Sequence, residues 1–331
     1  MRKKYEFVND DTIEVDGITL TRIRSLVDIP CVVTAGDLGG YLEDEENLSH
    51  SGQCWVGDNA WVMNNARVLN DASVSGDAEV MSDAIVSGEA RVLGAAIISD
   101  SAHILNSATI SGNAFVHGKS SVGGRSLITD NATVNGEAFI NGNARLLGSS
   151  AASGFCRIEG NSVLDDDCMV IDCASITDDA EISGFSVVKG NSVVCETAYV
   201  SDNTTIDGNS QIMGSSHIHG NATISGFSLI RGEADISSNN NHLVIGPLGH
   251  SGGYLTAHTD SEIGLRVNCD EFSGSTEDFI QWSKNQIDPR SEGSIEWISS
   301  MVSFIEARPS FMKYKSDIAL VRDLLRPRQT D

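Results

Sequence analysis

A six-residue repeat constrains this chain more than any other feature of its sequence. Residues 53–238 divide into 31 consecutive hexads without an insertion or a deletion. The fourth position of the hexad holds 14 Val, 14 Ile, 2 Leu and a single Ala, which is Ala152. The second position is always small, with 18 Ala, 9 Ser, 3 Cys and one Thr, and the sixth is mostly Gly, Asp or Asn. A short repeat sustained over this length indicates a solenoid built from stacked identical units.

Each position of the hexad has a physical role. The β-branched fourth residue favours an extended backbone and points inward together with the small residue two places earlier, which predicts a short strand in every hexad. Gly, Asn and Asp at the sixth position tolerate φ > 0, so the chain can turn there. Three cysteines, Cys54, Cys156 and Cys168, occupy the small inward position, where we expect them to pack as compact hydrophobes.

The order of aliphatic and small residues resembles the hexapeptide rule of left-handed parallel β-helices. This resemblance implies a mainly β fold in which three hexads make one 18-residue coil, with about ten coils over residues 53–238. The segment GDLGGYLEDEENLSHSGQCWVGDNAWV, residues 36–62, looks like the N-terminal signature of the YdcK-like β-helix proteins of bacteria and their phages. The resemblance extends over residues 1–238. It implies a bacterial or phage origin and brings no assigned enzymatic chemistry.

The two flanking regions lack the hexad. Residues 1–52 contain short alternating stretches around Asp16-Gly17, which predict a hairpin in an N-terminal β cap that covers the open strand edges of the solenoid. In residues 239–331, strands are predicted at 242–245, 254–259 and 264–267, followed by a helix that begins near Ser275. Two further helices are predicted around 295–305 and 318–325. This C-terminal α+β module looks like a small module found on phage proteins of unknown role.

Charge and cysteine usage restrict the partners and the compartment. The chain has 46 acidic and 22 basic residues, a net charge of −24. Such a surface repels nucleic-acid phosphates and anionic membranes, so we predict neither as a partner and favour a basic protein, such as a host protein. The basic start Met1-Arg2-Lys3-Lys4 is not followed by an apolar segment, and no apolar run approaches the ~18 residues that span a bilayer. Seven cysteines without a CxxC pair predict no disulfide framework, which favours a cytoplasmic location.

Enzymatic functions fit the repeat less well than a structural role does. Hexapeptide β-helices are best known as trimeric acyltransferases, whose chemistry needs a histidine base and a loop that extends from one coil. The repeat histidines, His103, His117 and the pair His217/His219, face outward on three different faces, and no hexad is interrupted. We therefore predict no catalytic residue, no cofactor and no metal site, with an acyltransferase as the alternative. The Asp-rich residues 165–179 are interpreted as turn residues rather than calcium ligands.

Five polar residues of the C-terminal module are candidates for a recognition site. A cysteine and a histidine that converge could also form a thiol nucleophile with its base. The candidates are His250, Tyr254, His258, Arg266 and Cys269.

An apolar row on one face of the predicted solenoid is the candidate for an interface. Taking every eighteenth residue at the third hexad position gives a row that also contains Glu79, Thr133, Ala151, Thr205 and Thr223. Its large apolar members are Trp61, Ile97, Phe115, Met169 and Val187. Exposed apolar rows commonly mark interfaces, and self-association into a dimer or trimer is the commonest form. The sequence thus predicts a non-enzymatic scaffold or interaction protein that assembles through this face and recognises a protein partner. A second alternative is an acidic mimic of nucleic acid that inhibits a host DNA-binding protein.

Overall fold

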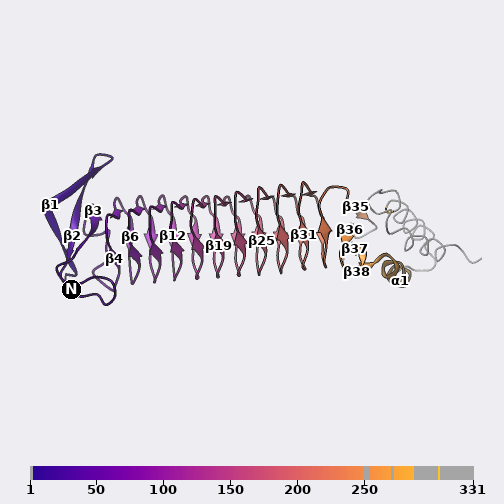
Figure 1. Cartoon of the computed structure of the whole chain (residues 1–331), viewed down its shortest axis with the longest axis horizontal. Helices are drawn as coiled ribbons and strands as arrows, with labels where there is room; N and C mark the ends of the chain where they lie inside the picture. The colour runs from indigo at the N-terminus through magenta and orange to yellow at the C-terminus, as the bar shows by residue number, and fades with distance from the viewer. Residues whose placement is uncertain (1–2, 249–252, 270–271, 287–304, 306–331) are drawn as a thin grey trace, which may run out of the picture. The chain divides into compact units, whose positions relative to one another are not determined.

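The computed structural model describes residues 3–248, 253–269, 272–286 and 305 (Figure 1). The chain forms two compact units, Met1–Gly184 and Phe185–Asp331, named here the N-terminal and the C-terminal unit. Both contain coils of a parallel β-solenoid in which each hexad forms one two-residue strand followed by a turn. The predicted mainly β repeat fold is confirmed.

In the N-terminal unit, strands 18 residues apart pair in parallel, so that Ile97 lies beside Phe115 and Arg91 beside Thr109. Three faces result, as the predicted three-hexad coil requires. The first face contains β5 (Trp61–Val62), β8 (Glu79–Val80), β11 (Ile97–Ile98), β14 (Phe115–Val116), β17 (Thr133–Val134), β20 (Ala151–Ala152) and β23 (Met169–Val170). The second contains β4 (Trp55–Val56), β7 (Ser73–Val74), β10 (Arg91–Val92), β13 (Thr109–Ile110), β16 (Leu127–Ile128), β19 (Arg145–Leu146), β22 (Val163–Leu164) and β25 (Glu181–Ile182). The third contains β6 (Arg67–Val68), β9 (Ile85–Val86), β12 (His103–Ile104), β15 (Ser121–Val122), β18 (Phe139–Ile140), β21 (Arg157–Ile158) and β24 (Ser175–Ile176).

Burial and turn geometry follow the hexad. The aliphatic residues at the fourth position are fully buried, and so are Cys156 and Cys168 at the second position. The sixth residue has a positive φ from Asp58 to Gly232, as predicted. An aspartate at this position has a further role, because its carboxylate accepts a hydrogen bond from the turn N–H one coil later. Asp100 Oδ2 accepts from the Gly118 N–H at 3.0 Å, for example.

Serine can replace alanine at inward positions of the solenoid where its hydroxyl group finds a local partner, whereas the buried Ser150 Oγ has none. Ser126 Oγ donates to the Gly123 carbonyl at 2.6 Å, and Ser162 Oγ donates to the Glu159 carbonyl at 2.8 Å. A buried hydroxyl group with such a partner avoids most of the free-energy penalty of leaving water. The parallel strand pairing of the first face also continues in register through Ala152, which belongs to the one hexad without a large aliphatic residue at its fourth position.

The N-terminal cap begins with the predicted hairpin, formed by β1 (Tyr5–Val15) and β2 (Ile18–Ser25) around Asp16-Gly17. Strand β3 (Leu38–Leu42) pairs antiparallel with β2 and parallel with β5, where Tyr41 lies beside Trp61. Parallel pairing with the solenoid therefore starts before the first hexad, and the cap extends the sheet of the first face.

The coils of the C-terminal unit repeat the same three-strand arrangement, with pairs such as His217 beside Asp235. The three sets of paired strands are β26 (Val187–Val188), β29 (Thr205–Ile206) and β32 (Thr223–Ile224); β28 (Tyr199–Val200), β31 (His217–Ile218) and β34 (Asp235–Ile236); and β27 (Val193–Val194), β30 (Gln211–Ile212) and β33 (Leu229–Ile230).

The C-terminal module is an antiparallel sheet with one described helix. Its strands are β35 (His242–Leu248), β36 (Gly253–Asp260), β37 (Gly264–Cys269) and β38 (Phe272–Ser275), and its helix is α1 (Thr276–Gln286). The first three strands and the helix start are as predicted, whereas β38 was not predicted. Ser275 Oγ accepts the Asp278 N–H at 3.2 Å, which makes Ser275 the N-cap of α1. The predicted helices around 295–305 and 318–325 lie outside the described residues, apart from Ile305.

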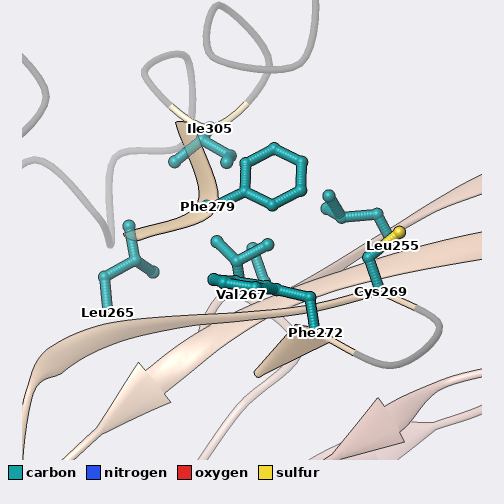
Figure 2. Packing of buried hydrophobic residues seen from close by; sticks show 8 residues of the cluster. Leu255, Leu265, Val267, Cys269, Phe272, Phe279 and Ile305 are labelled. Carbon is teal, nitrogen blue, oxygen red and sulfur yellow. The ribbon is translucent and has the colours of Figure 1, made fainter. Parts of the chain in front are cut away.

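One face of this sheet forms the hydrophobic core of the module (Figure 2). Leu255 and Val267 from the sheet pack with Phe279 from α1 and with Ile305, and all four side chains are buried. The opposite face of the sheet is polar and lies against the last coil of the same unit.

Candidate functional site

The residues of the predicted row are neighbours in register in the N-terminal unit, but Glu79 and Thr133 interrupt its apolar character. Ile97 pairs with Glu79 on one side and with Phe115 on the other, and Met169 pairs with Ala151. Val187 starts a corresponding row in the C-terminal unit, where it pairs with Thr205.

Trp61 is a member of this row that the cap partly covers. Its ring packs against the cluster of Leu20, Tyr41 and Met63, in which hairpin residues also take part. The sequence could not show this contact, because nothing in the repeat indicates where the hairpin folds back. The cap thus covers part of the row at Trp61, whereas Met169 further along is 41% exposed.

Sequence reasoning missed Phe155, whose side chain is 63% exposed, more than the 41% of Met169. It occupies the first hexad position, next to a turn. Phe155, Phe185 and Phe227 are the only aromatic residues at that position in the repeat, and this was the signal that could have found them. In the C-terminal unit, Phe227 is explained by its stacking on Tyr254, with ring centroids 4.5 Å apart.

A groove of about 1050 Å³ lies between the β2–β3 connection and the second face of the N-terminal unit. Its floor runs across three coils through Trp55, Ser73 and Arg91, which are neighbours in register. Its opposite wall includes Val32 and Leu38, which are 45% and 47% exposed.

The groove combines these apolar side chains with an excess of negative charge. Asp37, Asp58, Asp71 and Glu89 line it together with a single cation, Arg91, so four carboxylates face one guanidinium. Asp71 Oδ1 accepts the Gln53 N–H at 2.8 Å, and Asp58 Oδ2 accepts the Gly76 N–H at 3.0 Å, which fixes both carboxylates on the wall. A concave surface of this kind attracts positively charged groups.

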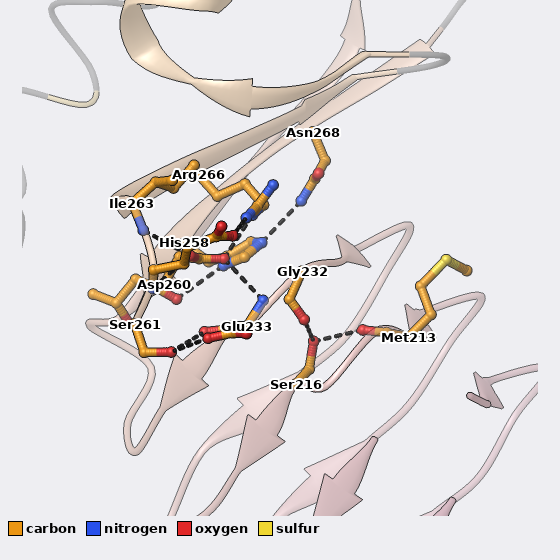
Figure 3. A network of polar contacts seen from close by, with 12 residues as sticks. Met213, Ser216, Gly232, Glu233, His258, Asp260, Ser261, Ile263, Arg266 and Asn268 are labelled. Carbon is orange, nitrogen blue, oxygen red and sulfur yellow. Dashed lines mark hydrogen bonds and ion pairs between the residues drawn. The ribbon is translucent and has the colours of Figure 1, made fainter. Parts of the chain in front are cut away.

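Two of the predicted polar residues, His258 and Arg266, support the side chains that bond the module to the last coil, Asn268 and Asp260 (Figure 3). His258 is fully buried, and its Nε2 lies 2.9 Å from Asn268 Nδ2, which also donates to the Leu229 carbonyl at 3.0 Å. Nδ1 of His258 lies 2.9 Å from the Thr259 carbonyl. Burial lowers the pKa of His258 to about 4, so the imidazole is neutral at neutral pH.

Arg266 belongs to the same docked face. Its Nε donates to Asp260 Oδ2 at 2.6 Å, and this oxygen also accepts the Glu233 N–H at 3.1 Å. Burial by itself would raise the pKa of Asp260, but the Arg266 guanidinium and the N–H groups of Ile263 and Glu233 hold that pKa below its usual value. Gly232 is needed beside this pair, because a Cβ there would lie 2.3 Å from Arg266 Nε.

The proposed thiol–imidazole pair does not form. Cys269 lies in the hydrophobic cluster on the other face of the sheet from His258, because alternate residues of a strand point to opposite sides. Tyr254 stacks on Phe227, and His250 lies outside the described residues. The three repeat cysteines Cys54, Cys156 and Cys168 are all fully buried, as their predicted packing role requires. Burial raises the pKa of Cys156 and Cys168 to about 12, and it also raises the pKa of Cys54, whose Sγ accepts a bond from Lys4 Nζ at 3.1 Å.

The repeat histidines separate into two kinds of environment. His103 and His117 belong to different faces of the N-terminal unit, as expected. His217 and His219 instead lie together with Asp235 in the C-terminal unit, an arrangement that the sequence analysis did not predict. Over residues 53–238, all of which the structure describes, no loop longer than a turn interrupts the coils.

Comparison with known proteins adds no family assignment. The chain matches no family model, and no curated protein is similar enough to count as a relative. The resemblance to YdcK-like β-helix proteins thus stays a prediction. Within the part of the chain that the structure describes, no helix has the length and apolar character needed to cross a membrane.

Proposed function

We propose that this chain is a non-enzymatic scaffold or interaction protein that recognises a basic protein segment at the groove beside its N-terminal cap. The groove carries this proposal, because it unites concavity, exposed apolar side chains and an excess of carboxylates in one place. An extended segment that alternates basic and apolar residues complements it, since Val32 and Leu38 offer apolar contacts opposite the acidic floor.

The acyltransferase alternative receives less support. Its chemistry needs a histidine base beside a cofactor cleft, and no histidine is among the residues that line the groove. The uninterrupted coils of residues 53–238 also lack the extended loop that would wall such a cleft. Calorimetry with acetyl-CoA tests this alternative directly, and we expect no heat of binding.

The groove proposal is tested with a labelled synthetic peptide that alternates lysine and leucine, followed by fluorescence anisotropy. Asp71→Asn combined with Glu89→Gln keeps the size of both side chains and removes two charges from the groove. The matched control, Asp165→Asn with Glu137→Gln, removes two charges from residues outside it. We expect the groove variant to weaken binding about tenfold and the control to change it about twofold or less.

Equal weakening in the two variants would mean that the peptide senses only the overall charge, and the groove would lose its role. Absence of peptide binding to the wild-type chain at low ionic strength would remove the proposal altogether.

Self-assembly through the first face is the second part of the proposed function. It rests on Ile97 and Phe115, which are neighbours in register, and on the exposed Met169. We expect Phe115→Asp with Met169→Asp to convert an oligomer into monomers when the mass is measured by light scattering. Thr109→Asp with Leu127→Asp places the same charges at third hexad positions of the second face and should leave the oligomer unchanged. A monomeric wild-type chain would end this part of the proposal.

A further inference from the structure

Two histidines and an aspartate gather on the outer surface of the last coils in the C-terminal unit. His217 on β31 and Asp235 on β34 are neighbours in register, exactly one coil of 18 residues apart in sequence. His219 follows His217 by two residues, so both imidazoles project from the same side of the chain. One ligand atom from each of the three residues lies within 4.8 Å of the other two.

The positions of these side chains are fixed by ring stacking and polar contacts. The two imidazoles stack with centroids 4.4 Å apart, and the Tyr199 ring stacks on His217 at 4.9 Å. His219 Nε2 lies 2.9 Å from Asp235 Oδ1, while His217 Nε2 lies 3.2 Å from Ser201 Oγ. Side chains held in this way lose little conformational entropy when they bind a common ligand.

We propose that His217, His219 and Asp235 bind a divalent transition-metal ion such as Zn²⁺. Imidazole nitrogen and carboxylate oxygen are the donor atoms that zinc takes in proteins, and three protein ligands leave an open position for water or for a group from a partner. The inference stands apart from the groove, which belongs to the other unit and contains none of these residues.

The local charge also suits a cation. Asp202 Oδ2 lies 4.0 Å from His219 Nδ1 and accepts the Gly220 N–H at 2.8 Å, so this second carboxylate is held beside the cluster. Partial burial and the neighbouring His219 lower the pKa of His217, although Asp235 and Asp202 act in the opposite direction. The neutral imidazole is the form that coordinates a metal.

A similar pair of stacked rings in the N-terminal unit, Phe115 and His117, shows which part of this arrangement is ordinary solenoid packing. His117 occupies the same hexad position as His219, stacks on Phe115 at 4.2 Å and lies 3.6 Å from Asp100. Phe115 stands where the other pair has His217, and its neighbour one coil later is Thr133 instead of an aspartate. Stacking and the turn aspartate thus occur at both pairs, whereas the three-ligand set occurs at His217.

The site would also fasten the end of the solenoid. Asp235 lies on β34, and the neighbouring Ala234 forms an antiparallel bridge with Asp260 of the C-terminal module. Thr259 Oγ1 donates to the Asp235 carbonyl. A metal ion that joins β31 to β34 would therefore hold the strand on which the module is docked, and it would stabilise the folded C-terminal unit by mass action.

Titration of the full chain with Zn²⁺ against a chromogenic chelator tests the site. We expect the wild type to bind one Zn²⁺ per chain. The His219→Ala and Asp235→Asn variants should bind this ion about tenfold more weakly or not at all. His117→Ala is the matched control and should leave the affinity unchanged. In a parallel thermal scan, Zn²⁺ should raise the unfolding midpoint of the wild type and of His117→Ala, but not that of Asp235→Asn.

A transplant keeps the test decisive if a substitution in the site disturbs folding. Phe115→His with Thr133→Asp recreates the three-ligand set around His117, and we expect this variant to bind one Zn²⁺ more than the wild type. Equal zinc binding by the wild type, His219→Ala and Asp235→Asn, each folded by circular dichroism, would overturn the proposal. A wild-type chain that binds no Zn²⁺ would overturn it as well.

Discussion

The two ends of the solenoid are closed by different kinds of contact. At the N-terminal end, the backbone of β3 joins the sheet of the first face, and the Tyr41 N–H donates to the Ala60 carbonyl at 2.9 Å. At the C-terminal end, the backbone contributes a single antiparallel bridge between Ala234 and Asp260 and a bond from the Ser261 N–H to the Glu233 carbonyl at 2.8 Å. Side chains on the polar face of a separate sheet add further bonds to the backbone of the last coil. Thr256 Oγ1 accepts the Leu229 N–H at 2.9 Å, for example.

This difference determines what each end is sensitive to. A backbone ladder depends on close approach of the chains, so its weak point is added volume. The cap adds one buried charged contact, in which Lys4 Nζ donates to the Cys54 carbonyl at 2.7 Å. The contact made through His258, Asp260 and Arg266 depends on charge and protonation. These groups are buried or nearly so, and therefore water cannot stabilise a new or unpaired charge at this place. We therefore expect the stability of the C-terminal end to depend on buried charge and on pH. We expect the stability of the N-terminal end to depend on added side-chain volume, such as one methyl group.

The largest effect is expected from Asp260→Ala at the C-terminal end. The fully buried carboxylate pairs with Arg266 and also accepts the N–H groups of Glu233, Glu262 and Ile263. Its removal leaves the nearly buried Arg266 with only the exposed Glu262 as an ionic partner, and breaking a buried pair in this way typically destabilises by about 3–5 kcal/mol. Amide hydrogen exchange of β36 and β37 should report a loss of this size.

Glu262→Gln provides the control for this prediction. Glu262 contacts the same Arg266 at 3.2 Å but is 63% exposed, so the change should have little effect on exchange. If Asp260→Ala changed the opening free energy no more than Glu262→Gln does, the polar contacts would not be what holds the module on the coil.

Acid should weaken the same end by a somewhat smaller amount. The pKa of His258 is about 4 in the folded chain, against an ordinary value of 6.5, because of burial and the positive charges of Arg266 and His242. The unfolded module therefore binds the proton first. The stability contributed by the neutral His258 is complete above pH 6.5, falls as the pH decreases from 6.5 to 4, and amounts to about 3 kcal/mol.

Hydrogen exchange of β36 and β37 between pH 7 and pH 4, corrected for the intrinsic exchange rate, measures this dependence. His258→Gln should remove the slope in that window, and the amides between β3 and β5 serve as an internal reference. The same slope in wild type and variant would assign the acid sensitivity to other groups.

The smallest of the three effects is expected at the N-terminal end, from Gly40→Ala. A Cβ at Gly40 would lie 2.2 Å from the Ala60 carbonyl oxygen, so β3 would have to shift away from its partner strand. Overpacking of this kind costs about 2 kcal/mol. Exchange of the β3 amides should increase accordingly, with β36 and β37 unchanged.

Gly57→Ala is the matched substitution nearby. A Cβ there would have no neighbour closer than 3.5 Å, which is an ordinary contact distance, and we expect a change near zero. If Gly40→Ala were as stable as Gly57→Ala, the cap would adjust to the added methyl group. The proposed difference between the two ends of the solenoid would then be wrong.

The solenoid could be predicted from the sequence because the residues of each hexad determine by themselves which side chain is buried and where the chain turns. The β-branched Val116 favours a buried strand position and Gly118 favours a turn with positive φ. The structure has Val116 fully buried and Gly118 at a φ of 74°, as predicted. The same local logic explained the buried Cys156 and the cap hairpin around Asp16-Gly17. Local patterns of this strength need no information about distant residues.

The candidate sites were less predictable, because they depend on contacts between distant segments. The repeat placed Trp61 on an outer face, but only the folded chain shows the cap packing on it. Strand alternation in the module separates Cys269 from His258, and the predicted strand 264–267 stopped short of Cys269 and gave no pairing register with its neighbour, so the sequence could not show this.

The sequence by itself determined the coil: its 18-residue period, its buried rows and its turns, all of which follow from side-chain shape and backbone preference within six residues. The tertiary structure decided which outward residues meet. The 18-residue period already implies that His217 and Asp235 are neighbours, whereas the approach of His219 Nε2 to within 2.9 Å of Asp235 Oδ1 is seen only in the folded chain. The groove at Trp55 exists because the β2–β3 connection lies over the second face. Such sites arise from long-range packing, which a local repeat does not encode.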